Sequence, residues 1–260
     1  MTPGHHPRRV NQNTDMIEIE VRGLSAAEIR VGETRITPSQ ERVFQTVFYL
    51  AIRAGERIPR SDLVETLWGT EPTARGRQSL RQMLYRLRQM GLTLDESGDT
   101  VRLDPARLRC DVSEALRDEW VGTAGADAVW AAADLLPGTG QGTTPGLEEW
   151  LEGLRARLAS QFRRAALRHV AEAKRAARWR EVEELALRVL YNDPLNEEAT
   201  LARAEALAMQ GSKAMALDVL DAYAKELGER NDRIGLPAAL LRKRISTSMT
   251  QANAKGEETE

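Results

Sequence analysis

The sequence predicts a mainly α-helical protein, with small β-sheets and three helices in its first part and an all-α region of stacked helices after it. Three observations support this fold class. Apolar and polar residues alternate over short stretches between residues 16 and 35, helical periodicity begins near residue 37, and a 34-residue repeat appears in the second half. With 260 residues, 42% of them hydrophobic, the chain can build one large core or two ordinary ones.

The N-terminal part has the pattern of short, half-exposed strands. Ile17, Ile19 and Val21 alternate with charged residues, and the same alternation recurs over residues 29–31. A period of two residues is typical of strands with one buried face. Gly23 provides a turn after the first of them.

Two helices follow these strands. The first begins with Thr37 as the expected cap, Pro38 in the first turn and Gln40 reaching back to the helix start. Its apolar face consists of Val43, Phe44, Val47, Phe48 and Ala51. Ser61 is expected to cap the second, shorter helix, and Gly69 to end it.

A third helix is predicted from about Thr73 to Met90. Leu80, Leu84 and Leu87 recur at the spacing of one buried helix face. Two short extended runs come next, at residues 92–94 and 101–103, and they predict a hairpin.

The third helix carries a local basic patch in a chain whose formal net charge is only -2. No acidic residue occurs between Glu71 and Asp95. The same segment contains five arginines, which are Arg75, Arg77, Arg81, Arg86 and Arg88. Cations bind DNA phosphates, and arginine or glutamine on an inserted helix can read base edges in the major groove. The alternative is an ordinary solvated or protein-binding face.

The order of elements favours DNA binding. Three helices, the third basic, followed directly by a hairpin, are the order of a winged helix-turn-helix. On the hairpin, Thr100 and Arg102 are candidate wing contacts. We expect the hairpin tip to stay clear of the DNA backbone, because Asp95, Glu96 and Asp99 would be repelled by phosphates.

The second half contains an internal repeat of 34 residues. The shift superimposes small or apolar residues, pairing Val182 with Ala216, Val189 with Tyr223, Ala173 with Leu207 and Ala177 with Gly211. Pro194 falls where a turn between paired helices is needed. The pattern predicts stacked helix pairs of the tetratricopeptide type, with a last helix entered through Pro237.

These patterns divide the chain into four segments. We expect a mobile arm over residues 1–15, a winged helix domain over 16–109, helical repeats over 110–246 and a disordered tail over 247–260. A single cysteine, Cys110, excludes an intramolecular disulfide, and the sequence has neither a membrane span nor a signal peptide. We therefore expect a soluble, intracellular protein and place it in the cytoplasm.

Two stretches of the sequence resemble the Streptomyces antibiotic regulatory protein family. The first is residues 55–69, ending in Leu67-Trp68-Gly69, followed by residues 74–88 with Ser79-Leu80-Arg81-Gln82 and Leu84-Tyr85-Arg86-Leu87-Arg88. The second resembles that family's bacterial transcriptional activator domain. Its matching parts are Leu136-Pro137-Gly138, Glu149–Glu152, Arg155–Leu158, Asn192–Ala199, Gly211 and Ala216-Leu217. Together they cover about residues 16–245.

The resemblance implies a transcriptional regulator. A member of this family is expected to bind direct repeats of double-stranded promoter DNA, as a homo-oligomer on the DNA, and to activate by contacting RNA polymerase and its sigma factor. Base or backbone contacts would fall on Gln78, Arg81, Gln82, Tyr85 and Arg86, with Arg75 and Arg77 flanking the groove. The alternative is a helical-repeat scaffold or adaptor whose winged helix binds protein.

No residue pattern indicates an enzyme, a metal site or a cofactor. The glycine-rich stretch 138–144 has no lysine and no preceding strand, so it does not fit a phosphate-binding loop. His5 and His6 lie in the expected arm without nearby ligands, and His169 stands alone. Cys110 is expected to be a small buried residue.

Overall fold

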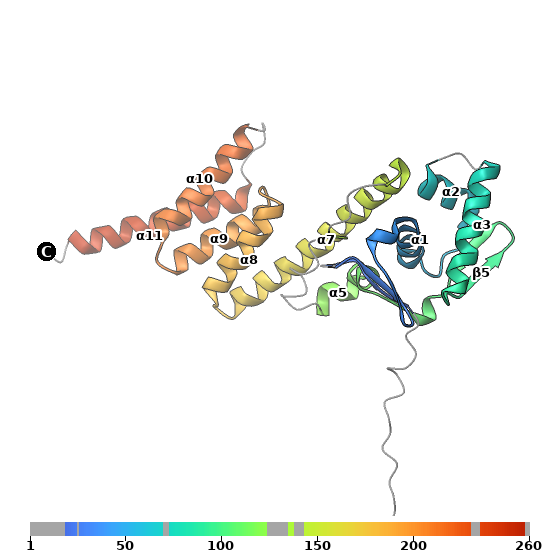
Figure 1. Ribbon diagram of the computed structural model, residues 1–260. Coiled ribbons are helices and arrows are strands. Elements are labelled where there is room, and N and C mark those ends of the chain that lie inside the picture. Colours follow the sequence, from blue (N-terminus) through green and yellow to red (C-terminus); the bar gives the residue numbers. More distant parts are fainter. Residues whose placement is uncertain are drawn as a thin grey trace, which may run out of the picture. The chain divides into compact units, whose positions relative to one another are not determined.

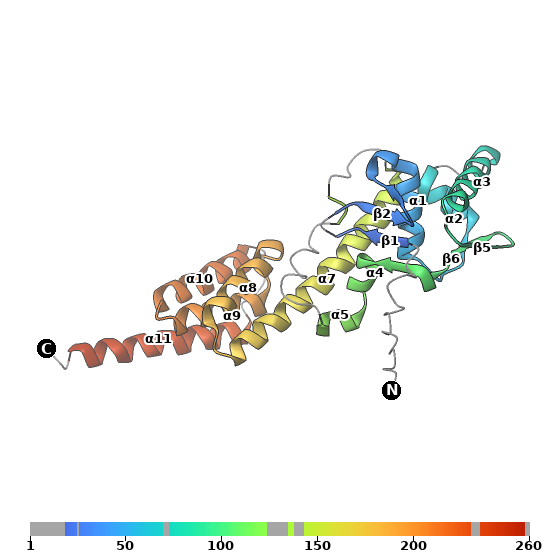
Figure 2. The same ribbon diagram turned by 60° about the horizontal axis from the view of Figure 1, so that its bottom comes forward.

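The computed structural model describes residues 19–24, 26–69, 73–123, 135–137, 143–229 and 235–257 (Figures 1 and 2). The chain forms two compact units. The first comprises residues 1–120 and 131–159, and the second comprises residues 121–130 and 160–260. Helix α5 (Asp118–Thr123) and helix α7 (Pro145–Arg175) each contribute residues to both units. The expected arm over residues 1–15 lies outside the described residues.

The first unit contains two small sheets and three principal helices. Its elements are β1 (Ile19–Arg22), β2 (Glu28–Val31), β3 (Thr34–Ile36), the 3-10 turn η1 (Pro38–Gln40), α1 (Glu41–Ile52), β4 (Ile58–Pro59), α2 (Arg60–Trp68), α3 (Ala74–Gln89), β5 (Leu94–Ser97), β6 (Thr100–Leu103), η2 (Pro105–Arg107), β7 (Leu108–Cys110) and α4 (Asp111–Ala115). Helix α1 contacts both α2 and α3. Figure 1 shows α3 beside the β5 hairpin.

The first sheet has the strand order β3-β2-β1-β7. Ile19 and Val21 of β1 point into the core, which confirms the predicted alternation. β3 and β7 were not predicted from the sequence. β3 follows β2 after a turn at Gly32, whose φ of 54° is in the left-handed region, and β7 pairs with β1 in parallel.

The helix starts differ in detail from the prediction. The Thr37 side chain caps no backbone N–H and instead lies 2.7 Å from the Ser39 hydroxyl, so residues 38–40 form a 3-10 turn before α1. Helix α2 begins at Arg60 rather than after Ser61. Pro59, the residue before α2, lies in β4 and pairs with Thr100 of β6, so the helix follows directly on the strand. Gly69 ends α2 with a φ of 65°, as expected.

The beginning of α7 belongs to the core of the first unit. The Trp150 ring centroid lies 4.7 Å from that of Tyr49 and 6.2 Å from that of Phe48 on α1. Aromatic pairs at this spacing stabilise a core beyond the area they bury. The two compact units therefore do not divide at residues 109 and 110 as expected, because residues 131–159 belong to the first unit, where Trp150 of α7 packs against α1.

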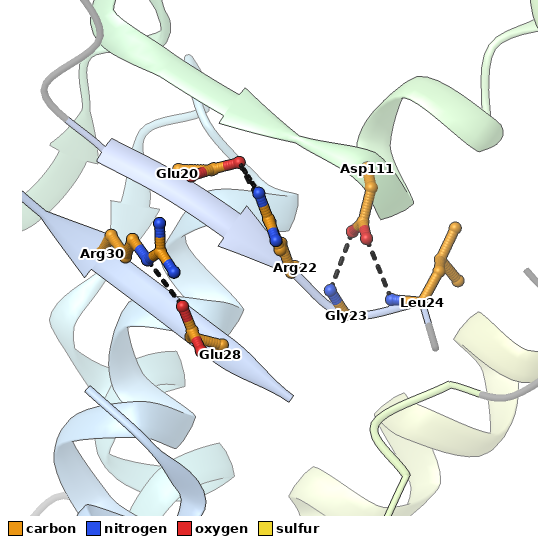
Figure 3. A network of polar contacts seen from close by, with 7 residues as sticks. All are labelled: Glu20, Arg22, Gly23, Leu24, Glu28, Arg30 and Asp111. Carbon is orange, nitrogen blue, oxygen red and sulfur yellow. Dashed lines mark hydrogen bonds and ion pairs between the residues drawn. The ribbon is translucent and has the colours of Figure 1, made fainter. Parts of the chain in front are cut away.

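The partly buried carboxylate of Asp111 links the start of α4 to the end of β1 (Figure 3). Asp111 accepts hydrogen bonds from the backbone N–H of Gly23 at 2.8 Å and of Leu24 at 3.1 Å, and one from Val112 at 2.7 Å. Burial raises the pKa of the Asp111 carboxyl above its ordinary value, while these three donors act in the opposite direction. The loop after β1 is thus held by a residue 87 or 88 positions away in the sequence.

The second unit is a stack of helices. After the second half of α7 come α8 (Trp179–Asn192), α9 (Glu197–Met209), α10 (Lys213–Glu229) and α11 (Leu236–Glu257). Consecutive helices from α8 to α11 are in contact, and Figures 1 and 2 show α8, α9 and α10 side by side. Helix α11 continues to Glu257, where a disordered tail from Thr247 was expected. Alanine, glutamine and lysine in this segment favour helix, which accounts for the difference.

The structure confirms the 34-residue repeat. The superimposed pairs Val182 with Ala216 and Ala173 with Leu207 are buried in both copies. The end of α7 and the end of α9 also have the same geometry. Ala177 and Gly211 both have positive φ, of 53° and 90°, and the backbone N–H of the next residue closes the helix end at 2.9 Å in each case.

Ala177→Gly is expected to raise the free energy of unfolding by about 0.5–1 kcal/mol, because glycine adopts positive φ without the strain that alanine suffers. Gly211→Ala is the matched opposite change and should lower it by about 1–2 kcal/mol. No atom lies within 4 Å of the position that a Gly211 Cβ would occupy, so the effect comes from the backbone alone. Urea denaturation followed by circular dichroism measures both, and equal signs for the two variants would contradict the assignment.

Candidate nucleic-acid interface

Helix α3 is fixed to the first unit by one apolar face. Leu80, Leu84 and Leu87 are at most 1% exposed. The Thr73 hydroxyl caps the helix start by accepting a hydrogen bond from the Gly76 backbone N–H at 3.2 Å. These contacts fix the rotation of the helix, so its polar face points away from the core.

All eight α3 residues predicted to bind DNA lie on that exposed side of the helix. They are Arg75, Arg77, Gln78, Arg81, Gln82, Tyr85, Arg86 and Arg88. At about 100° per residue, Gln78 and Gln82 lie almost opposite Leu80. Arginines occupy both flanks of this glutamine row, with Arg75 and Arg86 on one side and Arg77, Arg81 and Arg88 on the other.

The arginines of α3 differ in their surroundings. In the part of the chain that the structure describes, Arg75, Arg81 and Arg86 have no ion-pair partner. Arg88 forms an ion pair with Glu96 of β5, at 3.0 Å. The Tyr85 side chain is 59% exposed and adds an aromatic ring to the same face.

The predicted hairpin is present, and β4 adds a third strand to it in the order β4-β6-β5. Its two candidate contacts are partly buried. The Thr100 hydroxyl donates to the Ser97 carbonyl at 2.8 Å, and Arg102 lies opposite Asp95 in the strand register. Both residues are on β6, next to the hairpin turn at Gly98 and Asp99.

The acidic residues of the hairpin are not where the sequence placed them. Asp95 and Glu96 belong to strand β5, and only Asp99 is at the tip. Asp95 forms an ion pair with Arg57 at 2.8 Å, and Glu96 pairs with Arg60 as well as with Arg88. Strand pairing extends further than the apolar runs indicated, because Leu94 to Ser97 pair continuously with Leu103 to Thr100.

Sequence reasoning missed the contribution of Arg57 and Arg60. Both lie near the start of α2 and are separated from their acidic partners by 38 and 36 residues. No local spacing could have revealed these pairs. They offset the negative charge of two hairpin residues, Asp95 and Glu96.

The described part of the chain was also searched for a reactive cysteine, a metal site and a membrane-spanning helix. Cys110 is 3% exposed, and burial raises the pKa of its thiol, so the thiol stays protonated near neutral pH. Among the described residues, no group of three or more His, Cys, Asp or Glu is placed to hold a metal ion. His5, His6 and residues 138–142 lie outside those residues. No helix within the described ranges is long and apolar enough to cross a membrane.

The fold and this face define a winged helix-turn-helix protein with a basic third helix and a helical-repeat unit. A family model for the bacterial transcriptional activator domain matches residues 93–239. The chain belongs to this family. Together with the N-terminal winged helix, this match confirms the resemblance to the Streptomyces antibiotic regulatory protein family seen in the sequence.

The fold is also similar to a solved structure, that of Mycobacterium tuberculosis EmbR in complex with a low affinity phosphopeptide. The TM-score is 0.67 at 16% sequence identity, over 90% of this chain. The chain spans 65% of the length of that structure. A comparison with curated proteins found no match.

Proposed function

We propose that the protein binds specific sequences of duplex promoter DNA by inserting α3 into the major groove. The observation that carries this proposal is the exposed, acid-free face of α3, where a glutamine row lies between arginines, three of them without an ion-pair partner among the described residues. Glutamine reads adenine and arginine reads guanine in the major groove, while flanking arginines bind phosphates. Gln78, Arg81, Gln82, Tyr85 and Arg86 are the contacts we assign to bases and nearby backbone.

The remaining predicted residues have supporting roles in this proposal. Arg75 and Arg77 flank the groove, and Thr100 and Arg102 contact the DNA from the wing. The family resemblance supports binding to direct repeats, so more than one copy of the chain occupies an operator. Copies side by side on DNA bind more tightly than one alone, through effective concentration.

The helical repeats supply the protein contacts that change transcription, with RNA polymerase and its sigma factor as the partners. Two apolar side chains on α8 support a contact surface there. Tyr191 is 87% exposed and Leu187, one helical turn earlier, is 40% exposed. Large exposed apolar groups of this kind are typical of interaction sites when they occur together. The protein acts by binding and not by catalysis, and it needs no cofactor.

Two measurements on the full chain test this division of labour. Selection by the protein from a library of random-sequence DNA duplexes should enrich a defined motif. When the selected duplex is placed upstream of a promoter, the protein should stimulate transcription by purified RNA polymerase. The double variant Leu187→Ala with Tyr191→Ala should bind the selected duplex as the wild type does but lose stimulation. Ala171→Ser, an exposed change on α7, is the control and should alter neither.

Two results would overturn the proposal. Enrichment of no motif, with no retention of duplex DNA at low salt, would favour the helical-repeat scaffold whose winged helix binds protein. Full stimulation by the α8 double variant would move the activating surface away from Leu187 and Tyr191.

A further inference from the structure

We propose that Glu96 limits the sequence-independent DNA affinity of the DNA-binding unit by holding Arg60 and Arg88 away from DNA phosphates. This inference rests on the proposed DNA binding by α3. Its basis is a single carboxylate that forms ion pairs with arginines from two different helices. It makes Glu96 a positioning residue, because it acts through the two guanidinium groups rather than through the DNA.

The geometry places Glu96 at the junction of three elements. It lies on β5, opposite Val101 of β6. One carboxylate oxygen, Oε2, pairs with Arg60, the first residue of α2, and the other, Oε1, lies 3.0 Å from a guanidinium nitrogen of Arg88 in the last turn of α3. The hairpin is thereby linked to the start of one helix and the end of the other.

The Glu96–Arg60 ion pair is better shielded than the neighbouring pair on the same strand, whereas the Arg88 side chain is 47% exposed. The side chains of Glu96 and Arg60 are 20% and 24% exposed, whereas those of Asp95 and Arg57 are 47% and 48% exposed. Partly buried ion pairs are less screened by salt and persist where exposed pairs weaken. Arg88 is also attracted by the negative end of the α3 dipole, which further favours its bound position.

The consequence for DNA binding follows from what an arginine adds. A cation on phosphate strengthens binding to every sequence equally and carries no sequence information. Arg60 and Arg88, released beside α3, would therefore raise affinity for random DNA. By holding both, Glu96 leaves the glutamine row and the uncommitted arginines of α3 as the main determinants of affinity.

The salt dependence of binding measures how many cations contact phosphate. Each phosphate contact contributes about 0.9 to the slope of log affinity against log salt. With the full chain and a random-sequence duplex, Glu96→Gln should steepen this slope by about 1 for each arginine released. The affinities for a selected and a random duplex should rise by the same factor, so that their ratio stays unchanged.

Asp99→Asn is the matched control. It removes one negative charge from the same hairpin, but Asp99 has no ion-pair partner among the residues that the structure describes. It should leave the slope unchanged. A general effect of net charge would move both variants alike and would overturn the inference.

Arg88→Gln shows whether the released arginine is responsible. The sequence placed Arg88 among the candidate DNA contacts, but the ion pair with Glu96 withdraws it from them. In an otherwise wild-type chain, Arg88→Gln should therefore leave the salt slope unchanged. In the Glu96→Gln background it should remove about 1 from the steepened slope. A shallower slope for Arg88→Gln in the wild type would mean that Arg88 binds phosphate there, and would refute the proposal.

Folding and DNA binding are separated by two further measurements. Glu96→Asp keeps the charge on a shorter side chain, so its salt slope should lie between those of the wild type and Glu96→Gln. Near-UV circular dichroism checks that each variant is folded. If Glu96→Gln and Glu96→Asp are both folded and both have the salt slope of the wild type, the role of Glu96 is wrong, while the proposed DNA binding by α3 still stands. Absence of any duplex binding by the wild type would instead overturn the proposed function.

Discussion

Leu84→Ala is expected to lower the free energy of unfolding of the first unit by about 2–5 kcal/mol. Leu84 is 0% exposed and lies between Leu80 and Leu87 on the face of α3 that packs on the core. Truncation removes buried methyl groups and leaves a cavity that neighbouring helices can fill only in part. Urea denaturation followed by circular dichroism gives the free energy directly.

Gln82→Ala is the matched control for this change. It lies on the same helix but is exposed, so its effect on unfolding should stay within about 0.5 kcal/mol. Leu84→Ala should also weaken DNA binding, but only at temperatures where the first unit unfolds. If Leu84→Ala has the melting temperature of the wild type, Leu84 is not buried and α3 is rotated about its axis relative to the structure described here.

Arg81→Ala and Gln82→Ala should each weaken binding to a selected duplex by about 1–3 kcal/mol, which is roughly a 5- to 150-fold loss of affinity. Both side chains are exposed on α3, and Arg81 has no ion-pair partner among the described residues. A base contact that is removed leaves the base edge unsatisfied. The affected base position should therefore become less selective, and titration against single-base variants of the duplex measures this.

Arg109→Ala provides the control for loss of charge. Arg109 is exposed on β7, outside α3, and its replacement should change specific affinity by less than either α3 variant. Circular dichroism spectra like that of the wild type in all three variants would show that a loss of affinity is not caused by a loss of folded structure. If Arg81→Ala and Gln82→Ala both bind the selected duplex with wild-type affinity, the proposed insertion of α3 into the major groove is wrong.

Much of the interface could be predicted because its signals are local. Leu80, Leu84 and Leu87 set the buried side of α3, and that alone determines that Gln82 and Arg86 are exposed, since helix geometry relates positions three and four residues apart. The 34-residue repeat was visible for the same reason, because equivalent helix ends such as Ala177 and Gly211 recur at a fixed spacing.

The sequence by itself determined the order of the three helices and the hairpin, the exposed face of α3 and the repeat. Only the tertiary structure decided that Glu96 pairs with Arg60 and Arg88, that β7 lies beside β1 and that Trp150 packs on α1. Periodicity arises from hydrogen bonding and side-chain direction between near neighbours, so it leaves a pattern in the sequence. Ion pairs and ring contacts between distant segments depend on where the folded chain brings them, and they leave no such pattern.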